Sequence, residues 1–100
     1  MKRWIVSRPA LEDLDDVWSY VARKGGHDET ADRFVARIIG KFSILASFPG
    51  IGRRADKVRK GSRAFPVGDY IIYYRISRGR IVVQRIIHGR RDQERAQRER

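Results

Sequence analysis

The chain has 100 residues and a formal net charge of +11, with 23 Lys and Arg residues against 12 Asp and Glu residues. Its length predicts one domain, and the absence of cysteine excludes disulfide bonds, thiolate metal sites and cysteine nucleophiles. The positive charge favours an anionic partner, namely nucleic acid, an acidic protein or an anionic membrane surface. The N-terminus does not resemble a signal peptide and no apolar run approaches the roughly 20 residues of a membrane span, so we expect a cytoplasmic protein.

Residues 3–7 form a short β-prone run, and a helix follows from Pro9, because proline is tolerated in a first helical turn but not in a central strand. Apolar residues then recur at three- and four-residue steps, which predicts one helical face: Leu11, Leu14, Trp18 and Val21. Carboxylates crowd the early turns, where the helix dipole stabilises negative charge: Glu12, Asp13, Asp15 and Asp16. Gly25 and Gly26 end this helix.

A second helix is predicted to begin near Asp28–Thr30, whose side chains can cap free backbone amides. Its apolar face again follows three- and four-residue steps: Ala31, Phe34, Val35, Ile38, Phe42 and Leu45. Gly40 costs about 1 kcal/mol relative to alanine inside a helix, so we expect close helix packing to require a small residue there. The helix ends at Phe48–Gly52, because Pro49 and two glycines cannot continue it.

The middle and the end of the chain are strongly basic. Residues 53–63 carry six basic side chains against Asp56 alone, a net charge of +5 (six minus one), which predicts an exposed cationic connection. Residues 89–100 contain almost no apolar side chain, so we expect a flexible basic tail on a single domain that spans residues 1–100.

The remaining segments are predicted to be β-strands. Residues 63–67 form a short strand, in which Pro66 indicates an edge or a bulge. Residues 70–76 and 80–88 form a hairpin, and their apolar residues occur at both parities, which predicts central strands with both faces largely covered. The fold class is therefore α+β, with two N-terminal helices packed on one face of a small antiparallel sheet in the order β-α-α-β-β-β.

Four segments together resemble the RelE/ParE toxin superfamily, in family order and over nearly the whole chain. They are SRPALEDLDDVWSYV (7–21), LASFPGIGRR (45–54), GSRAFPVGDYIIYYRI (61–76) and RIIHGRRD (85–92). The resemblance implies a toxin of a type II toxin–antitoxin module that needs no cofactor and forms a hetero-oligomer with its antitoxin, a ParD-like or other small acidic protein. ParE-like members of the superfamily poison DNA gyrase, and RelE-like members cut mRNA on the ribosome.

The candidate catalytic residues favour the ParE-like branch. RNA cleavage needs a proton acceptor, cations around the phosphate and an acid for the leaving oxygen. Arg63, His88 and Arg91 are the candidates for a RelE-like nuclease, yet no tyrosine or histidine follows His88 to act as the usual acid. Two isolated histidines give no metal-site signal. We therefore expect an inhibitor that acts by binding, with the RelE-like endonuclease as the alternative and a non-toxic nucleic-acid-binding module as the second alternative.

Two surfaces follow from this hypothesis. The expected target-binding residues are basic: Arg53, Arg54, Lys57, Arg59, Lys60, Arg63, Arg90 and Arg91. The expected antitoxin-binding residues are apolar or aromatic and lie on the first helix and the sheet: Leu14, Trp18, Val21 and Tyr73.

Overall fold

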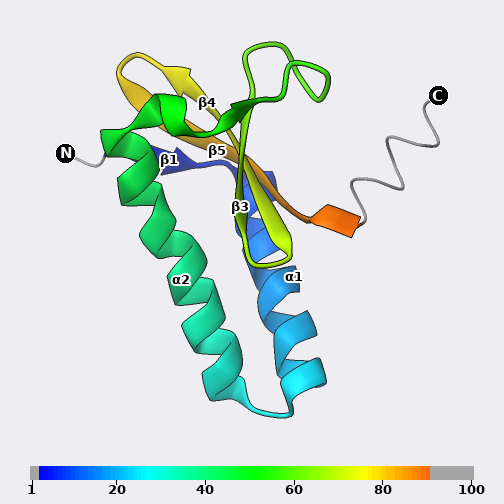
Figure 1. Ribbon diagram of the computed structural model, residues 1–100. Helices are drawn as coiled ribbons and strands as arrows, with labels where there is room; N and C mark the ends of the chain where they lie inside the picture. Colours follow the sequence, from blue (N-terminus) through cyan, green and yellow to red (C-terminus); the bar gives the residue numbers. More distant parts are fainter. Residues whose placement is uncertain (1–2, 91–100) are drawn as a thin grey trace.

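The computed structural model describes residues 3–90, which fold as two helices against one face of a five-stranded sheet (Figure 1). In chain order the elements are β1 (Trp4–Val6), α1 (Arg8–Gly25), α2 (Asp28–Ser47), the 3-10 helix η1 (Pro49–Ile51), β2 (Arg53–Arg54), β3 (Arg63–Val67), β4 (Tyr70–Ser77) and β5 (Arg80–His88). The strand order in the sheet is β1-β5-β4-β3-β2. The predicted α+β class and element order are confirmed. No helix within residues 3–90 is both long and apolar enough to cross a bilayer.

Two details of the sheet differ from the sequence prediction. β1 runs parallel to β5, with Trp4 opposite Ile81, so the sheet is mixed rather than wholly antiparallel. Between β1 and β5 the chain passes through both helices to the far edge of the sheet and returns through β2, β3 and β4, and such a long crossover allows parallel pairing. In addition, Arg53 and Arg54 form β2 against β3, so the segment predicted as a loop begins with a short edge strand.

The buried face of α1 is rotated slightly from the predicted face. Ala10, Leu14 and Val17 are buried in the main core, whereas Leu11, which the pattern placed on the same helical face as Leu14, is 52 % exposed. The helix begins at Arg8, after Ser7 as its N-cap, and Ala10 rather than Leu11 then faces the sheet. A three- and four-residue pattern admits both choices, because neighbouring positions lie only 100° apart around a helix.

The predicted core face of α2 is confirmed, since Ala31, Ile38, Phe42 and Leu45 are all buried. Gly40 is exposed, and apart from its chain neighbours and the backbone of its own helix, no atom of the described residues lies within 4 Å of the position that a Cβ would occupy there. The expected packing of Gly40 against a neighbour is therefore wrong. The predicted side-chain cap is also wrong, because the N-cap residue is His27 and its side chain makes no capping hydrogen bond.

A bulge in β5 explains why apolar residues occur at both odd- and even-numbered positions of this strand. Tyr73 lies opposite Arg85 and Tyr74 lies opposite Val83, so Gln84 is an extra residue in β5. The bulge shifts the alternation by one, and both Val83 and Ile86 belong to the core beneath the helices. The opposite face is covered only in part, contrary to the prediction that both faces are largely covered, because many of its side chains are half-exposed.

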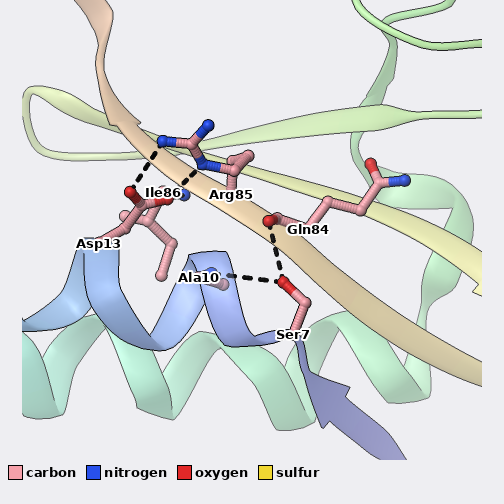
Figure 2. A network of polar contacts seen from close by, with 6 residues as sticks. All are labelled: Ser7, Ala10, Asp13, Gln84, Arg85 and Ile86. Carbon is pink, nitrogen blue, oxygen red and sulfur yellow. Dashed lines mark hydrogen bonds and ion pairs between the residues drawn. The ribbon is translucent and has the colours of Figure 1, made fainter.

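The start of α1 pairs with β5 beyond the point where β1 ends (Figure 2). Ser7 N–H donates to the Val83 carbonyl at 3.0 Å, and Ser7 Oγ donates to the Gln84 carbonyl at 3.0 Å. Asp13 Oδ2 then accepts the backbone N–H of Ile86 at 2.8 Å. These contacts satisfy the free edge of β5, whose backbone groups would otherwise be unpaired.

Asp13 also forms an ion pair with Arg85. Arg85 Nε donates to Asp13 Oδ2 at 2.8 Å and Nη2 donates to Oδ1 at 3.0 Å, a bidentate arrangement. This hydrogen bonding is the main reason why the pKa of Arg85 is raised. The sequence pattern associated Asp13 with the helix dipole. Its burial follows from the face that α1 turns to the sheet, because Asp13 lies four residues before the buried Val17.

Replacing Asp13 with alanine should lower the free energy of unfolding by about 2–3 kcal/mol, because it leaves a buried amide without its acceptor and Arg85 without its counter-ion. Urea unfolding followed by circular dichroism measures this loss. Asp15→Ala, which removes an exposed carboxylate from the same helix, should change stability by less than about 0.5 kcal/mol. Equal losses in both variants would contradict the role assigned to the contact between Asp13 and β5.

Candidate functional site

A buried tyrosine holds the turn from which the cationic segment starts. The Tyr74 hydroxyl donates to the Pro49 carbonyl at 2.7 Å and accepts the Gly52 N–H at 3.0 Å. Burial raises the pKa of this phenol. A Cβ at position 52 would lie 2.5 Å from the Tyr74 hydroxyl oxygen, so only glycine fits there. The Pro-x-x-Gly spacing of this segment therefore serves the close approach of the turn to β4.

Arg63 supports the same turn from β3. Its Nη1 donates to the Gly52 carbonyl at 2.8 Å and contacts the Gly50 carbonyl at 3.4 Å. A guanidinium that already donates to these carbonyls has fewer donors left for an external phosphate. The structure therefore gives Arg63, which the sequence suggested for both target binding and catalysis, an internal structural contact.

Residues 55–62 form a compact loop that closes on itself. The Ala55 N–H donates to the Ser62 carbonyl at 2.8 Å, and both residues are buried. The Gly61 N–H donates to Asp56 Oδ1 at 2.9 Å. The loop backbone is thus ordered by its own hydrogen bonds.

The loop is also attached to the sheet face opposite the helices. Ala55 packs with Ala64 and Tyr73 in a second, smaller apolar cluster. Tyr73 alternates along β4 with residues of the main core, so it points to the other face. Ser62 Oγ donates to Gln84 Oε1 at 2.8 Å and connects the loop to the bulge in β5.

The structure gathers most of the predicted target-binding residues at this loop. Four exposed basic residues, called here the loop cations, are Arg53, Lys57, Arg59 and Lys60. Arg54 is also exposed but pairs with Asp56 at 3.3 Å. Arg90 follows the distant end of β5, apart from the loop. Arg91 and residues 92–100, which were predicted as part of the basic tail, lie outside the described residues.

The candidate catalytic residues Arg63 and His88 do not come together. Arg63 lies opposite Tyr74 and His88 lies opposite Tyr70, so they flank β4 about 13 Å apart along the strand. His88 Nδ1 accepts the Arg90 N–H at 3.2 Å, and its ring packs edge-on against Tyr70. Within the described part of the chain, no three His, Asp or Glu side chains are grouped to hold a metal ion.

The predicted antitoxin-binding residues are partly inside the fold. Leu14 is 8 % exposed and Tyr73 is 1 % exposed, so neither presents a side chain at the surface. Trp18 and Val21 are half-buried. Trp18 Nε1 donates to Asp32 Oδ1 at 2.8 Å and joins α1 to α2 on their outer side.

Two exposed apolar residues extend the outer surface around Trp18. Leu11 lies seven residues before Trp18, and Ile39 lies seven residues after Asp32, so each returns to nearly the same side of its helix. Because α1 and α2 are antiparallel (Figure 1), both residues are displaced by about 10 Å from the Trp18–Asp32 hydrogen bond, in the same direction, away from the turn between the helices. Leu11 is 52 % and Ile39 is 41 % exposed. We call Leu11, Trp18 and Ile39 the helix seam.

The family model described as ParE toxin of type II toxin-antitoxin system, parDE, matches residues 4–93. This chain belongs to the ParE toxin family. Toxin ParE1 of Caulobacter vibrioides is 31 % identical over 88 residues, which cover 88 % of this chain and 90 % of that protein. Toxin ParE3 of the same species is 36 % identical over 90 residues, covering 90 % and 89 %. Toxin ParE1 of Mycobacterium tuberculosis is 30 % identical over 94 residues, covering 93 % and 95 %.

A solved chain from the chromosomal ParDE toxin–antitoxin system of P. aeruginosa has the same fold, with a TM-score of 0.75 and 23 % sequence identity. The similarity covers 88 % of this chain and 96 % of that chain. The resemblance to the ParE-like branch of the RelE/ParE superfamily is thus confirmed. As a ParE-family toxin of a type II system, the chain has an antitoxin as its implied partner.

Replacing Tyr74 with phenylalanine should destabilise the protein by about 1–3 kcal/mol, because a part-buried carbonyl and a buried N–H lose their partner. The amides of residues 50–54 should also exchange hydrogen faster in the native state, which mass spectrometry can measure. Tyr20→Phe provides the control, since Tyr20 is 41 % exposed. An unchanged exchange rate at the turn in Tyr74→Phe would contradict this role of the hydroxyl.

Proposed function

We propose that this ParE-family toxin poisons DNA gyrase by binding to it and stabilising its complex with cleaved DNA, and that a cognate antitoxin neutralises it. The family match and the relatives named as ParE toxins support a toxin of this branch. The loop cations supply the target-binding surface in this proposal. All four are exposed, three of them lie on an ordered loop and Arg53 lies on the adjoining strand β2, and a cationic surface attracts an anionic target.

The separation of Arg63 from His88 is the main reason to prefer a mechanism of inhibition by binding over RNA cleavage. A general acid or base must reach the reacting group together with the cations that stabilise the phosphate. Arg63 is hydrogen-bonded to the turn, and His88 lies at the other end of β4. This arrangement counts against the RelE-like endonuclease. The ParE-toxin relatives count against a non-toxic nucleic-acid-binding module.

The helix seam is the proposed antitoxin-binding surface. It keeps Trp18 from the sequence prediction and adds two exposed aliphatic residues. Leu14 belongs to the main core and Val21 packs against that core, so neither is part of this surface. Exposed apolar residues that lie between two helices suit the apolar face of an incoming helix.

Purified toxin added to DNA gyrase and supercoiled plasmid should increase the amount of cleaved plasmid trapped after denaturation. The reason is that a poison stabilises the state in which gyrase has cut the DNA. His88→Gln should act like the unsubstituted protein in this assay and should still stop growth when expressed.

The nuclease hypothesis makes the opposite prediction for the same variant. If His88→Gln abolishes growth inhibition, and if the unsubstituted toxin cuts mRNA on translating ribosomes while gyrase is unaffected, gyrase poisoning is wrong.

Replacing Leu11 and Ile39 together with serine should weaken binding of the cognate antitoxin by at least about tenfold, because two exposed apolar anchors are lost. Isothermal titration calorimetry with the purified antitoxin measures the affinity. Ile76→Ser is the matched control, since Ile76 is 49 % exposed on β4, away from the helix seam. Unchanged affinity in the double variant would exclude the helix seam as the main antitoxin contact.

A further inference from the structure

The loop cations have no anionic partner within the described protein. In residues 3–90 no ion pair or side-chain hydrogen bond engages any of the four. Asp56, the one carboxylate of this segment, accepts the Gly61 N–H and pairs with Arg54. The hydrogen bond from Gly61 is the main cause of the lowered pKa of Asp56, which therefore stays ionised at neutral pH as part of the loop's own structure.

The loop holds these charges in place before any ligand arrives. The Val58 N–H donates to the Ala55 carbonyl at 3.0 Å, and the Ser62 N–H donates to the Arg59 carbonyl at 2.9 Å. Like charges on a short segment repel one another, and the backbone bonds oppose the spreading of the loop. A polyanion would relieve this repulsion and would pay little for ordering the loop backbone.

The composition of the exposed loop surface indicates a nucleic-acid backbone rather than a protein. Protein interfaces are depleted in lysine and depend on aromatic or other apolar anchors, whereas two of the four loop cations are lysines. In residues 55–62 the one large exposed apolar side chain is Val58. A duplex offers a dense, regular row of phosphates, which Lys and Arg bind without any need for apolar contact.

From these observations we infer that the loop cations form a binding site for the phosphate backbone of duplex DNA. The inference builds on the proposed function, in which the toxin acts on a complex of gyrase with DNA, and it assigns the DNA of that complex to this surface. The toxin itself, and not only gyrase, then holds the DNA.

Within residues 3–90 the loop cations and the carboxylates of α1 lie on opposite faces of the sheet. Arg53 lies on the edge strand β2, and Lys57, Arg59 and Lys60 lie on the loop between β2 and β3, which packs on the sheet face opposite the helices. The carboxylates of Glu12 and Asp16 lie near Arg85 on β5, on the side of the sheet that carries α1. A polyanion is therefore attracted to the loop edge and is repelled by the acidic part of α1.

Binding of the full-length toxin to a fluorescein-labelled 20-base-pair duplex, followed by fluorescence anisotropy between 50 and 200 mM KCl, tests this inference. The variant Lys57→Gln/Arg59→Gln/Lys60→Gln should bind at least about 30-fold more weakly near 100 mM salt. The slope of log K against log salt should fall by about 2–3, because three phosphate contacts are lost. The control Arg23→Gln/Arg33→Gln/Arg37→Gln removes the same charge from exposed helix positions and should change the affinity only slightly.

Three results would overturn the inference. They are undetectable binding of the unsubstituted toxin, equal weakening in the two triple variants with both still folded by circular dichroism, and tighter binding of an RNA hairpin than of the duplex. The gyrase cleavage assay is separate from this measurement. If the toxin binds DNA through the loop but does not poison gyrase, the DNA site stands and the proposed function is refuted. If the loop variant poisons gyrase as strongly as the unsubstituted toxin, the DNA site has no role in gyrase poisoning.

Discussion

The carboxylate of Asp13 decides how the first helix meets the sheet. β1 pairs with β5 only as far as Val83, and beyond that point the outer edge of β5 would present unpaired backbone groups. Ser7 and Asp13 form hydrogen bonds with that edge, Ser7 as the N-cap of α1 and Asp13 nearly two turns further along the helix. Because the same short stretch caps the helix and pairs with the strand, the position and the rotation of α1 follow from it (Figure 2).

The opposite edge of the sheet depends on a second polar arrangement. Tyr74 and Arg63 hold the turn after α2 by its backbone carbonyls and one N–H, and the cationic loop starts directly from that turn. One arginine of this region is therefore structural, while the loop cations remain exposed. The fold presents an acidic helix near one edge and a cationic loop at the other, an arrangement suited to orienting a binding protein toward a polyanion.

Several parts of the fold were predictable from local patterns, and the exceptions share one cause. The bounds of both helices and the β4–β5 hairpin follow from apolar periodicity and from glycine and proline punctuation. The predictions for Leu11 and Gly40 were wrong because the pattern of apolar residues in a helix does not show which side of the helix packs against another element of the fold. The bulge at Gln84 was equally invisible, since strands with and without a bulge have similar composition.

The sequence alone determined the helices, the hairpin, the net charge and the family, because each depends on residues close together in the chain or on a sum over it. It did not determine which basic residues are free to bind. Arg63 and Arg53 have the same side chain, yet one is hydrogen-bonded to a turn eleven residues away and the other is exposed. Asp13 likewise has its partners more than seventy residues away. Only the tertiary structure brings such groups together, because hydrogen bonds depend on distance and direction in space and not on spacing along the chain.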